Sequence, residues 1–269
     1  MKDAAAPRLV EAMRYASLGE GKRLRPFFVV AASRLFDVPA PYALRTGAAL
    51  ECVHCYSLVH DDLPAMDNDD VRRGKPTVHR AFDEATAILA GDSLLTFAFG
   101  ILADPATHGD AGVRASLVGE LARAAGKDGM AGGQMLDIEA EKHPARDLES
   151  VMRLQAMKTG ALFRFACEAG AILGQAERSP LRQYAEHIGL AYQIADDVLD
   201  VESTPEALGK ATQKDRGKGK ATFVDLLGLD GAKARAQALV KDASDALAPY
   251  GTKAELLKQA AHFIASREK

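Results

Sequence analysis

The spacing of the prolines is the feature that most limits how this chain can fold. Eleven prolines divide 269 residues into long intervals rich in Ala, Leu, Glu and Arg. Helices usually end near proline, because it lacks a backbone N–H and clashes with the preceding turn. Apolar residues recur at helical spacing over 40–63, 80–103, 111–126, 147–173, 180–203, 231–248 and 252–267. Only FFVV at 27–30 is ambiguous, so the sequence predicts a single all-α domain over residues 1–269.

Composition excludes several classes of protein. A net charge of −3 and 48% hydrophobic residues are typical of a globular chain, and neither basic excess nor abundant aromatics indicates nucleic-acid binding. No run reaches eighteen uninterrupted apolar residues and the N-terminus lacks a signal-peptide pattern, so we expect a cytoplasmic protein without stable membrane insertion. Cys52 and Cys55 form a C-x-x-C without a second pair, inside an apolar run. We expect them to be reduced and buried rather than zinc ligands.

An acidic box follows the helix expected over 40–63. Five of the ten residues from Asp61 to Asp70 are aspartates, and three basic residues come shortly after them, Arg72, Arg73 and Lys75. Crowded carboxylates repel one another unless a cation lies among them, and an oxygen-only cluster suits Mg²⁺ or Mn²⁺. Phosphate oxygens commonly fill the open positions of such an ion, and the basic residues would meet the remaining charge. The alternative is a solvated acidic turn after a helix.

A second acidic box, QIADDVLD, lies far downstream and favours the metal interpretation. Asp196 and Asp200 are four residues apart and therefore share one helix face, with Asp197 beside them. The surrounding helix is largely apolar, so these acids are not simply its solvated side. We expect the two boxes to face each other across a cavity and to share a metal–diphosphate group.

Five motifs in a fixed order carry a resemblance to a known family: GKRLRP at 21–26, DDLPAMD at 61–67 followed by RRGKP, GGQ at 132–134, KTG at 158–160 and DDVLD at 196–200. The chain resembles the short-chain trans-isoprenyl diphosphate synthases, and most of all the bacterial farnesyl diphosphate synthases. The resemblance implies an all-α isoprenoid-synthase bundle around a central cavity, working as a homodimer. It departs from the family in a shorter leading helix and in Glu20, where a second glycine is usual.

The same resemblance implies the roles of individual residues. The two aspartate boxes would form the metal site: Asp61, Asp62, Asp67, Asp196, Asp197 and Asp200. In the first box Asp61 and Asp67 would bind the metal directly, and Asp62 would support them. The diphosphate of isopentenyl diphosphate would be bound by Lys22, Arg25, His54 and Arg73, with Arg23 left at the surface. The allylic diphosphate would meet Arg72, Lys158 and Lys210, with Gln134 bordering its site. Oxygens of Thr159 and Gln193 would stabilise the developing allylic cation.

The stretch ALGKATQKDRGKGKAT, residues 207–222, is rich in lysine and glycine. It reads either as a basic lid over polyphosphate or as an ordinary solvent loop. Under the family resemblance Asp215 helps to hold the metals and Lys220 fixes this loop.

The reaction implied is the condensation of isopentenyl diphosphate with dimethylallyl or geranyl diphosphate to farnesyl diphosphate. Tyr56 lies five residues before Asp61, with Cys52 one turn deeper, and this aromatic resembles the residue that limits the product to fifteen carbons in bacterial relatives. Alternatives are a geranyl or geranylgeranyl diphosphate synthase, a terpene cyclase, or an idle subunit of a heteromeric synthase. A cyclase generally lacks the second box and the GKRLRP turn, and an idle subunit is expected to have lost a box or the lysines.

Overall fold

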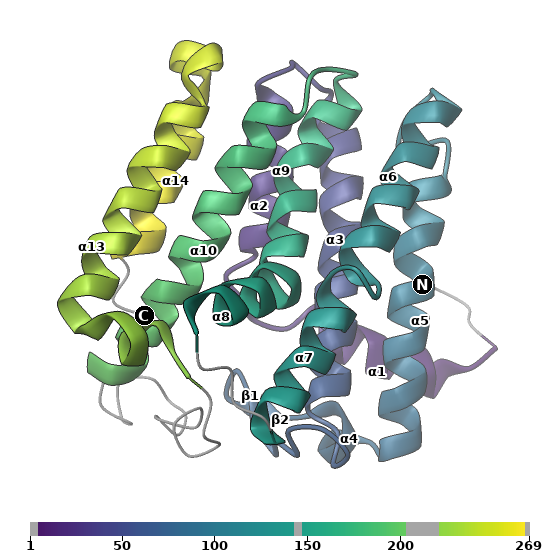
Figure 1. Cartoon of the computed structure of the whole chain (residues 1–269). Coiled ribbons are helices and arrows are strands. Elements are labelled where there is room, and N and C mark those ends of the chain that lie inside the picture. Colours follow the sequence, from purple (N-terminus) through teal and green to yellow (C-terminus); the bar gives the residue numbers. More distant parts are fainter. Residues whose placement is uncertain (1–4, 143–146, 203–220, 267–269) are drawn as a thin grey trace. The chain divides into compact units, whose positions relative to one another are not determined.

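The computed structural model of the chain describes residues 5–142, 147–202 and 221–266 (Figure 1). Almost all regular structure in these ranges is helical, so the predicted all-α fold is confirmed. The first half contains α1 (Pro7–Ser17), α2 (Leu24–Arg34), α3 (Ala40–Asp61), β1 (Val71–Arg72), β2 (Lys75–Pro76), α4 (Val78–Ala81), α5 (Glu84–Ala103) and α6 (Ala111–Ala125). The second half contains α7 (Met130–Lys142), α8 (Leu148–Gln155), the π-helix η1 (Ala156–Gly160), α9 (Ala161–Leu173), α10 (Ser179–Glu202), α13 (Phe223–Ala246), the 3₁₀-helix η2 (Ala248–Ala254) and α14 (Glu255–Ser266).

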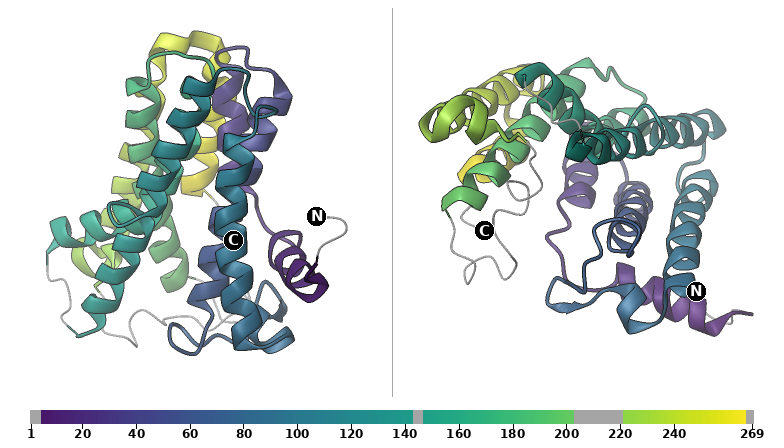
Figure 2. Two further views of the ribbon diagram at one scale, coloured as in Figure 1. Left: turned by 90° about the vertical axis from the view of Figure 1, so that its right-hand side faces the viewer. Right: turned by 60° about the horizontal axis from the view of Figure 1, so that its bottom comes forward.

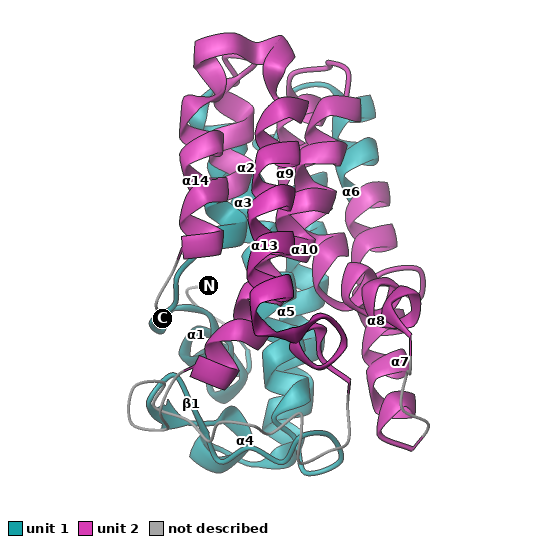
Figure 3. Cartoon of the chain, turned by 60° about the vertical axis from the view of Figure 1, so that its left-hand side comes forward, with its two compact units in different colours: residues 1–27, 39–118 teal, residues 28–38, 119–269 magenta. Residues whose placement is uncertain are grey.

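The chain forms two compact units (Figure 3). Unit 1 comprises residues 1–27 and 39–118, and unit 2 comprises residues 28–38 and 119–269. Each unit has its own packed helices, and each contains one of the two acidic boxes.

Unit 1 is built on α3 and α5, which pack along each other, with α1 against both (Figures 1 and 2). Gly91 of α5 permits this approach, since a Cβ at that position would lie 2.1 Å from Nε2 of His60. Buried apolar side chains from α1, α3, α4, α5 and the turn after α3 form a core cluster: Ala12, Met13, Cys55, Val59, Leu63, Val78, Ala87, Ala90 and Leu94. The core therefore lies directly beside the last turns of α3, which lead into the first acidic box.

In unit 2, α10 packs along α13 and α9 (Figures 1 and 2). Every residue from Ala161 to Leu173 is buried except Arg164. The ring of Phe28 meets that of Phe163 edge-on at 5.7 Å between centroids. Phe28 belongs to the FFVV run, which is helical, so the strand alternative for residues 27–30 is wrong.

Two details of the fold were not expected. The run predicted over 147–173 is helical throughout, but it contains the π-helix η1 between α8 and α9. The helix predicted over 231–248 begins earlier, at Phe223, and is interrupted at Gly228, whose φ of 71° is left-handed. Glycine tolerates that conformation because it has no Cβ.

One described helix, α5, has the length and hydropathy of a membrane span, with a mean hydropathy of 1.7. A core helix of a folded protein passes the same test, and α5 packs against α3, α1 and α4. Cys52, Cys55 and Cys167 are free thiols; Cys55 is buried as predicted, whereas Cys52 is only partly buried. Burial raises the pKa of Cys52 to about 11 and that of Cys55 to about 12.

Candidate functional site

The first acidic box begins where α3 ends, at Asp61. Pro64 cannot continue the helix, and the chain turns back so that the backbone N–H of Asp67 donates to the carbonyl of Asp61 at 2.8 Å. The left-handed Asn68, with φ of 52°, completes this turn. The backbone of Asp67 therefore returns to Asp61 despite their separation in the sequence.

Asp62 differs from its neighbours because it is buried and already paired. Its side chain is 4% exposed, and Arg72 Nε donates to both of its carboxylate oxygens, at 2.7 and 2.9 Å. Burial raises the pKa of Asp62, while the hydrogen bonds from Arg72 act in the opposite direction. A carboxylate held in this way orients Arg72, which agrees with a supporting rather than a direct metal-binding role.

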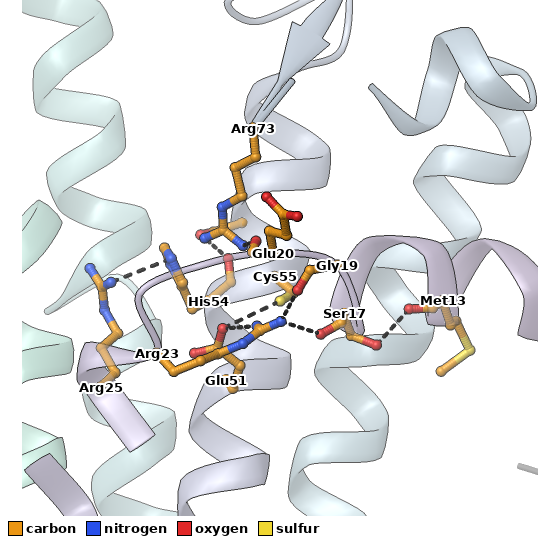
Figure 4. Close-up of polar contacts among 11 residues, drawn as sticks. Met13, Ser17, Gly19, Glu20, Arg23, Arg25, Glu51, His54, Cys55 and Arg73 are labelled. Carbon is orange, nitrogen blue, oxygen red and sulfur yellow. Dashed lines mark hydrogen bonds and ion pairs between the residues drawn. The ribbon is translucent and has the colours of Figure 1, made fainter. Parts of the chain in front are cut away.

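The basic residues predicted for isopentenyl diphosphate lie together in unit 1 (Figure 4). Arg25 Nη1 lies 3.4 Å from His54 Nε2. Arg73 Nη1 donates to the carbonyl of Glu20 at 2.9 Å and passes over Gly21, where a Cβ would lie 2.6 Å from it. The turn between them carries the exposed Lys22. Three distant segments of sequence thus supply one cationic cluster.

His54 is the neutral member of this cluster. Its pKa is held well below the ordinary value, first by burial and then by the positive charges of Arg25, Arg73, Arg72 and Arg23. A neutral imidazole beside arginines can take up a proton when a dianionic group such as a diphosphate enters, because the added negative charge favours the imidazolium.

Arg23, expected at the surface, is only partly exposed, at 33% of its side chain, and it is paired. Its guanidinium forms an ion pair with Glu51, whose side chain is only 12% exposed. Sequence reasoning overlooked this pair, although one signal was available. Glu51 lies in the apolar run of α3, and a buried carboxylate there requires a cationic partner.

The second acidic box lies on α10 in unit 2. Asp196, Asp197 and Asp200 are all partly buried, and the helical spacing expected for them is confirmed. Asp197 Oδ2 accepts a hydrogen bond of 2.7 Å from the backbone N–H of Phe223, the first residue of α13. The box is thereby joined to the start of the next described helix.

Lys158 and Thr159 lie on the π-helix η1. Such single-turn π-bulges are frequent at functional sites. Lys158 Nζ lies 2.6 Å from Asp137 Oδ2 on α7, so the anionic partner that a part-buried lysine needs comes from the same chain. Gly132 and Gly133 lie inside the continuous helix α7. Gly133 allows contact with η1, since a Cβ there would lie 2.2 Å from the backbone nitrogen of Lys158.

A pocket of about 140 Å³ in unit 2 gathers several of the predicted residues. It is lined by Asp137, Ala140, Val151, Leu154, Gln155, Lys158, Gln193, Asp197, Ala221 and Thr222. Gln193 Nε2 donates to Gln155 Oε1 at 2.5 Å, so its own oxygen remains available as an acceptor. Gln134, predicted to border this region, lies on α7 one turn before Asp137.

Tyr56 and Cys52 lie on α3, against the unit 1 core. The Tyr56 ring meets the His60 ring edge-on, at 5.8 Å between centroids. Burial raises the pKa of Tyr56, and the nearby charge of Asp61 adds to the effect. The aromatic side chain therefore lies close to the first box, where the prediction requires it.

Some predicted residues cannot be placed. Lys210, Asp215 and Lys220 lie outside the described residues. Within the described ranges, no three His, Cys, Asp or Glu side chains converge closely enough to hold a metal ion. The donor chemistry nonetheless fits a hard cation, because both boxes offer only carboxylate oxygens.

Comparison with known proteins gives one consistent result. The family model for polyprenyl synthetase matches residues 6–260. Farnesyl diphosphate synthase of Escherichia coli (strain K12) is 46% identical over 273 residues, covering 97% of this chain and 90% of the relative. The Bacillus subtilis (strain 168) enzyme of that name is 41% identical, covering 97% and 89%. The solved apo structure of an FPP/GFPP synthase from Zymomonas mobilis is 51% identical with a TM-score of 0.90, covering 98% and 91%.

Proposed function

The chain belongs to the polyprenyl synthetase family, and we propose that it condenses isopentenyl diphosphate with dimethylallyl or geranyl diphosphate to give farnesyl diphosphate. Relatives named farnesyl diphosphate synthase, 46% and 41% identical over nearly the whole chain, support this activity. The fold is that of the isoprenoid synthases. A single family match over residues 6–260 supports one synthase domain.

The observation that carries the proposal is the cationic cluster of unit 1. Arg25, His54 and Arg73 come from distant parts of the sequence, yet they meet beside the turn that carries Lys22. Several arginines around a neutral imidazole form a receptor for a polyanion, and a diphosphate is the polyanion that this family uses. These four residues are therefore proposed to bind isopentenyl diphosphate.

The allylic diphosphate is proposed to bind at the acidic boxes. Asp61 and Asp67, supported by Asp62, and the second box of Asp196, Asp197 and Asp200 would hold Mg²⁺ or Mn²⁺. A bound divalent ion would neutralise the charge of the diphosphate while the carbon–oxygen bond breaks. Arg72 and Lys158 would contribute further positive charge, together with Lys210 from outside the described residues.

The chemical steps need few residues of the protein itself. The allylic carbon–oxygen bond breaks, and oxygens of Thr159 and Gln193 stabilise the cation that forms. The alkene of isopentenyl diphosphate attacks this cation, and a proton then leaves to form the new double bond. The released diphosphate is the proposed base, because Lys158 keeps it beside the reacting carbons. Excluding water protects the cation from hydrolysis.

Product length is proposed to be set by Tyr56. A growing prenyl chain that runs along α3 away from Asp61 meets this ring, which is packed against the unit 1 core. A fifteen-carbon product follows if the ring forms the floor of the pocket. The Zymomonas mobilis neighbour carries the name FPP/GFPP synthase, and a direct measurement of product length tests the assignment of Tyr56.

A homodimer in the cytoplasm is the proposed working form. Ile88, Leu89 and Phe97 of α5 are 45%, 55% and 39% exposed. Leu89 and Phe97, about two turns apart, share one side of the helix, and exposed apolar side chains of this size indicate a surface that a second protein covers. A second copy of this chain is the proposed partner.

The activity is tested by incubating the purified chain with isopentenyl diphosphate, Mg²⁺ and either dimethylallyl or geranyl diphosphate. Chromatography of the dephosphorylated products should give farnesol from both primers. Cyclic hydrocarbons would indicate a terpene cyclase. No product from either primer would indicate an idle subunit, and a longer alcohol would overturn the assignment of product length.

A further inference from the structure

We propose that Arg23 and Glu51 form a positioning pair that holds the turn from Gly19 to Arg25 in the shape in which it binds isopentenyl diphosphate. The inference rests on the proposed function, because it assumes that Lys22 and Arg25 are ligands of that diphosphate. Neither Arg23 nor Glu51 is proposed to touch the substrate. Their role is to fix the backbone between the residues that do.

The backbone at Arg23 needs such support. Its φ of 52° lies in the left-handed region, which is uncommon for a residue with a side chain. Arg23 stands between Lys22 and Arg25, immediately before α2 begins at Leu24. The left-handed residue therefore sets the direction in which Lys22 leaves the turn and Arg25 enters the helix. Strain of this kind persists only where surrounding contacts hold it.

The contacts that hold it come from the Arg23 side chain. Arg23 Nη2 donates to the carbonyl of Ser17 at 3.1 Å and to that of Gly19, while Nη1 donates to Glu51 Oε1 (Figure 4). One guanidinium thus joins the end of α1, the turn and the middle of α3. The planar fork of arginine can serve three acceptors at once, whereas the ammonium of lysine lacks this fixed geometry.

Glu51 fixes the pair to the correct part of α3. The whole residue is 9% exposed. Glu51 precedes His54 by three residues, so the two side chains leave the same side of the helix. The turn of α3 that carries His54 is consequently tied to Arg23 as well. The thiol of Cys55 lies 4.0 Å from Glu51 Oε1 and completes the surroundings of the carboxylate.

The opposite side of the turn is held by Arg73, through the carbonyl of Glu20. In Figure 4 Arg25 extends toward His54, while Arg23 extends the other way, toward Glu51 and Ser17. Arg23 therefore points away from Arg25 and has different hydrogen-bond partners from Arg25 and Arg73. Its charge is met by a carboxylate rather than left for a substrate.

A positioning role and a purely electrostatic role predict opposite results at Glu51. Replacing Glu51 with glutamine removes the negative charge that pairs with Arg23, one turn of α3 from His54, on which Arg25, Arg72 and Arg73 act. If charge alone mattered, a diphosphate would bind more tightly and its KM would fall. If the pair positions the turn, the KM for isopentenyl diphosphate rises instead.

The experiment measures steady-state kinetics of Glu51→Gln and Arg23→Lys with geranyl diphosphate as primer. Both variants should raise the KM for isopentenyl diphosphate about tenfold, while kcat and the KM for geranyl diphosphate change less than about twofold. Arg23→Lys keeps the charge but loses the fork, so an unchanged KM in that variant overturns the inference. A lowered KM in Glu51→Gln overturns it equally.

Two controls separate this inference from the proposed function. Arg25→Ala must raise the KM for isopentenyl diphosphate; if it does not, the proposed binding site itself is wrong. Arg45→Lys changes another ion pair of unit 1, with Asp104 at 3.1 Å, and should leave both KM values unchanged. If Arg25→Ala raises this KM and the Arg23 and Glu51 variants do not, the proposed binding site stands and only the positioning role is wrong.

If either variant fails to fold, the wild-type protein supplies the decisive reading. The amide of Phe27, which donates to the carbonyl of Arg23 at 3.0 Å, should exchange slowly without any diphosphate, because the pair already orders this backbone. Rapid exchange that slows only when isopentenyl diphosphate is added would show that the substrate orders the turn, and would contradict the proposal.

Discussion

Lys158 Nζ lies 2.6 Å from Asp137 Oδ2, and this ion pair joins the π-helix η1 to α7, with α8 between them in the sequence. The pair is largely shielded, with 30% of the lysine side chain and 13% of the aspartate side chain exposed. Both residues line the same pocket of unit 2 as Gln193 and Asp197. Under the proposed function, Lys158 would exchange Asp137 for a diphosphate oxygen when substrate binds.

Replacing Lys158 with alanine should lower kcat about a hundredfold, because the leaving diphosphate loses a preorganised cation. Asp137→Asn should cost less than about tenfold, since it removes only the group that holds the lysine before substrate binds. Rapid-quench kinetics with geranyl diphosphate measure both. Equal losses in the two variants would indicate that the ion pair serves the fold and not the reaction.

Tyr56→Ala should lengthen the product from fifteen to twenty or more carbons, because removing the ring deepens the pocket below Asp61. Product analysis by chromatography after dephosphorylation measures the change. Tyr42→Ala is the matched control on the same helix, since that ring instead packs edge-on against His108 at 5.1 Å. If Tyr56→Ala still makes only the fifteen-carbon product, the assignment of the pocket floor is wrong.

His54 should make the folded protein less stable in mild acid. Its folded-state pKa lies well below the ordinary value, so below about pH 6.5 the unfolded chain binds a proton that the folded chain does not. Stability from this group is therefore present above that pH and is lost as the pH falls toward the folded pKa. When the pH is lowered from 7.5 to 5.5, the Tm of the His54→Gln variant should fall by fewer degrees than the Tm of the wild type.

The control for that measurement is His262→Gln, on the exposed side of α14. This variant should keep the pH dependence of the wild-type Tm. An identical pH dependence in the His54→Gln variant would show that His54 is not held neutral by its surroundings.

Leu89→Lys on α5 should convert the proposed dimer into monomers, because a charge in the centre of a buried apolar surface is costly. Light scattering after size exclusion measures the mass. Phe263→Lys of α14 is the control, since Phe263 is equally exposed, at 55%, but lies in unit 2. A wild-type mass of about one chain would refute the dimer outright.

The helices could be predicted because their apolar periodicity is local and the prolines mark their ends. The same applies to Asp196, Asp197 and Asp200, whose helical spacing alone places them together. The π-helix η1 could not be predicted, since one widened turn leaves the apolar pattern over 147–173 nearly unchanged. The short hairpin of β1 and β2 could not be predicted either, because strands of two residues are too short to show an alternation of apolar and polar residues.

The partners of the charged side chains could not be predicted from the sequence for a different reason. Arg23 lies 28 residues from Glu51, and Lys158 lies 21 residues from Asp137. Each charge showed that a partner was needed, but only the folded chain shows which one. Arg23 was accordingly expected at the surface, because the left-handed turn that directs its side chain toward α3 has no signature in GKRLRP.

The central claim is that both acidic boxes act through divalent metal on one diphosphate. Calorimetry of Mn²⁺ binding in the presence of inorganic diphosphate tests it in the wild type, in Asp61→Asn, in Asp196→Asn and in the double variant. Asp70→Asn is the control, because Asp70 pairs with Arg80 at 2.5 Å on the surface. We predict that each box variant abolishes most of the coupled binding and that the double variant adds little further loss. Independent, additive losses, or metal binding that does not depend on the diphosphate, would contradict the account.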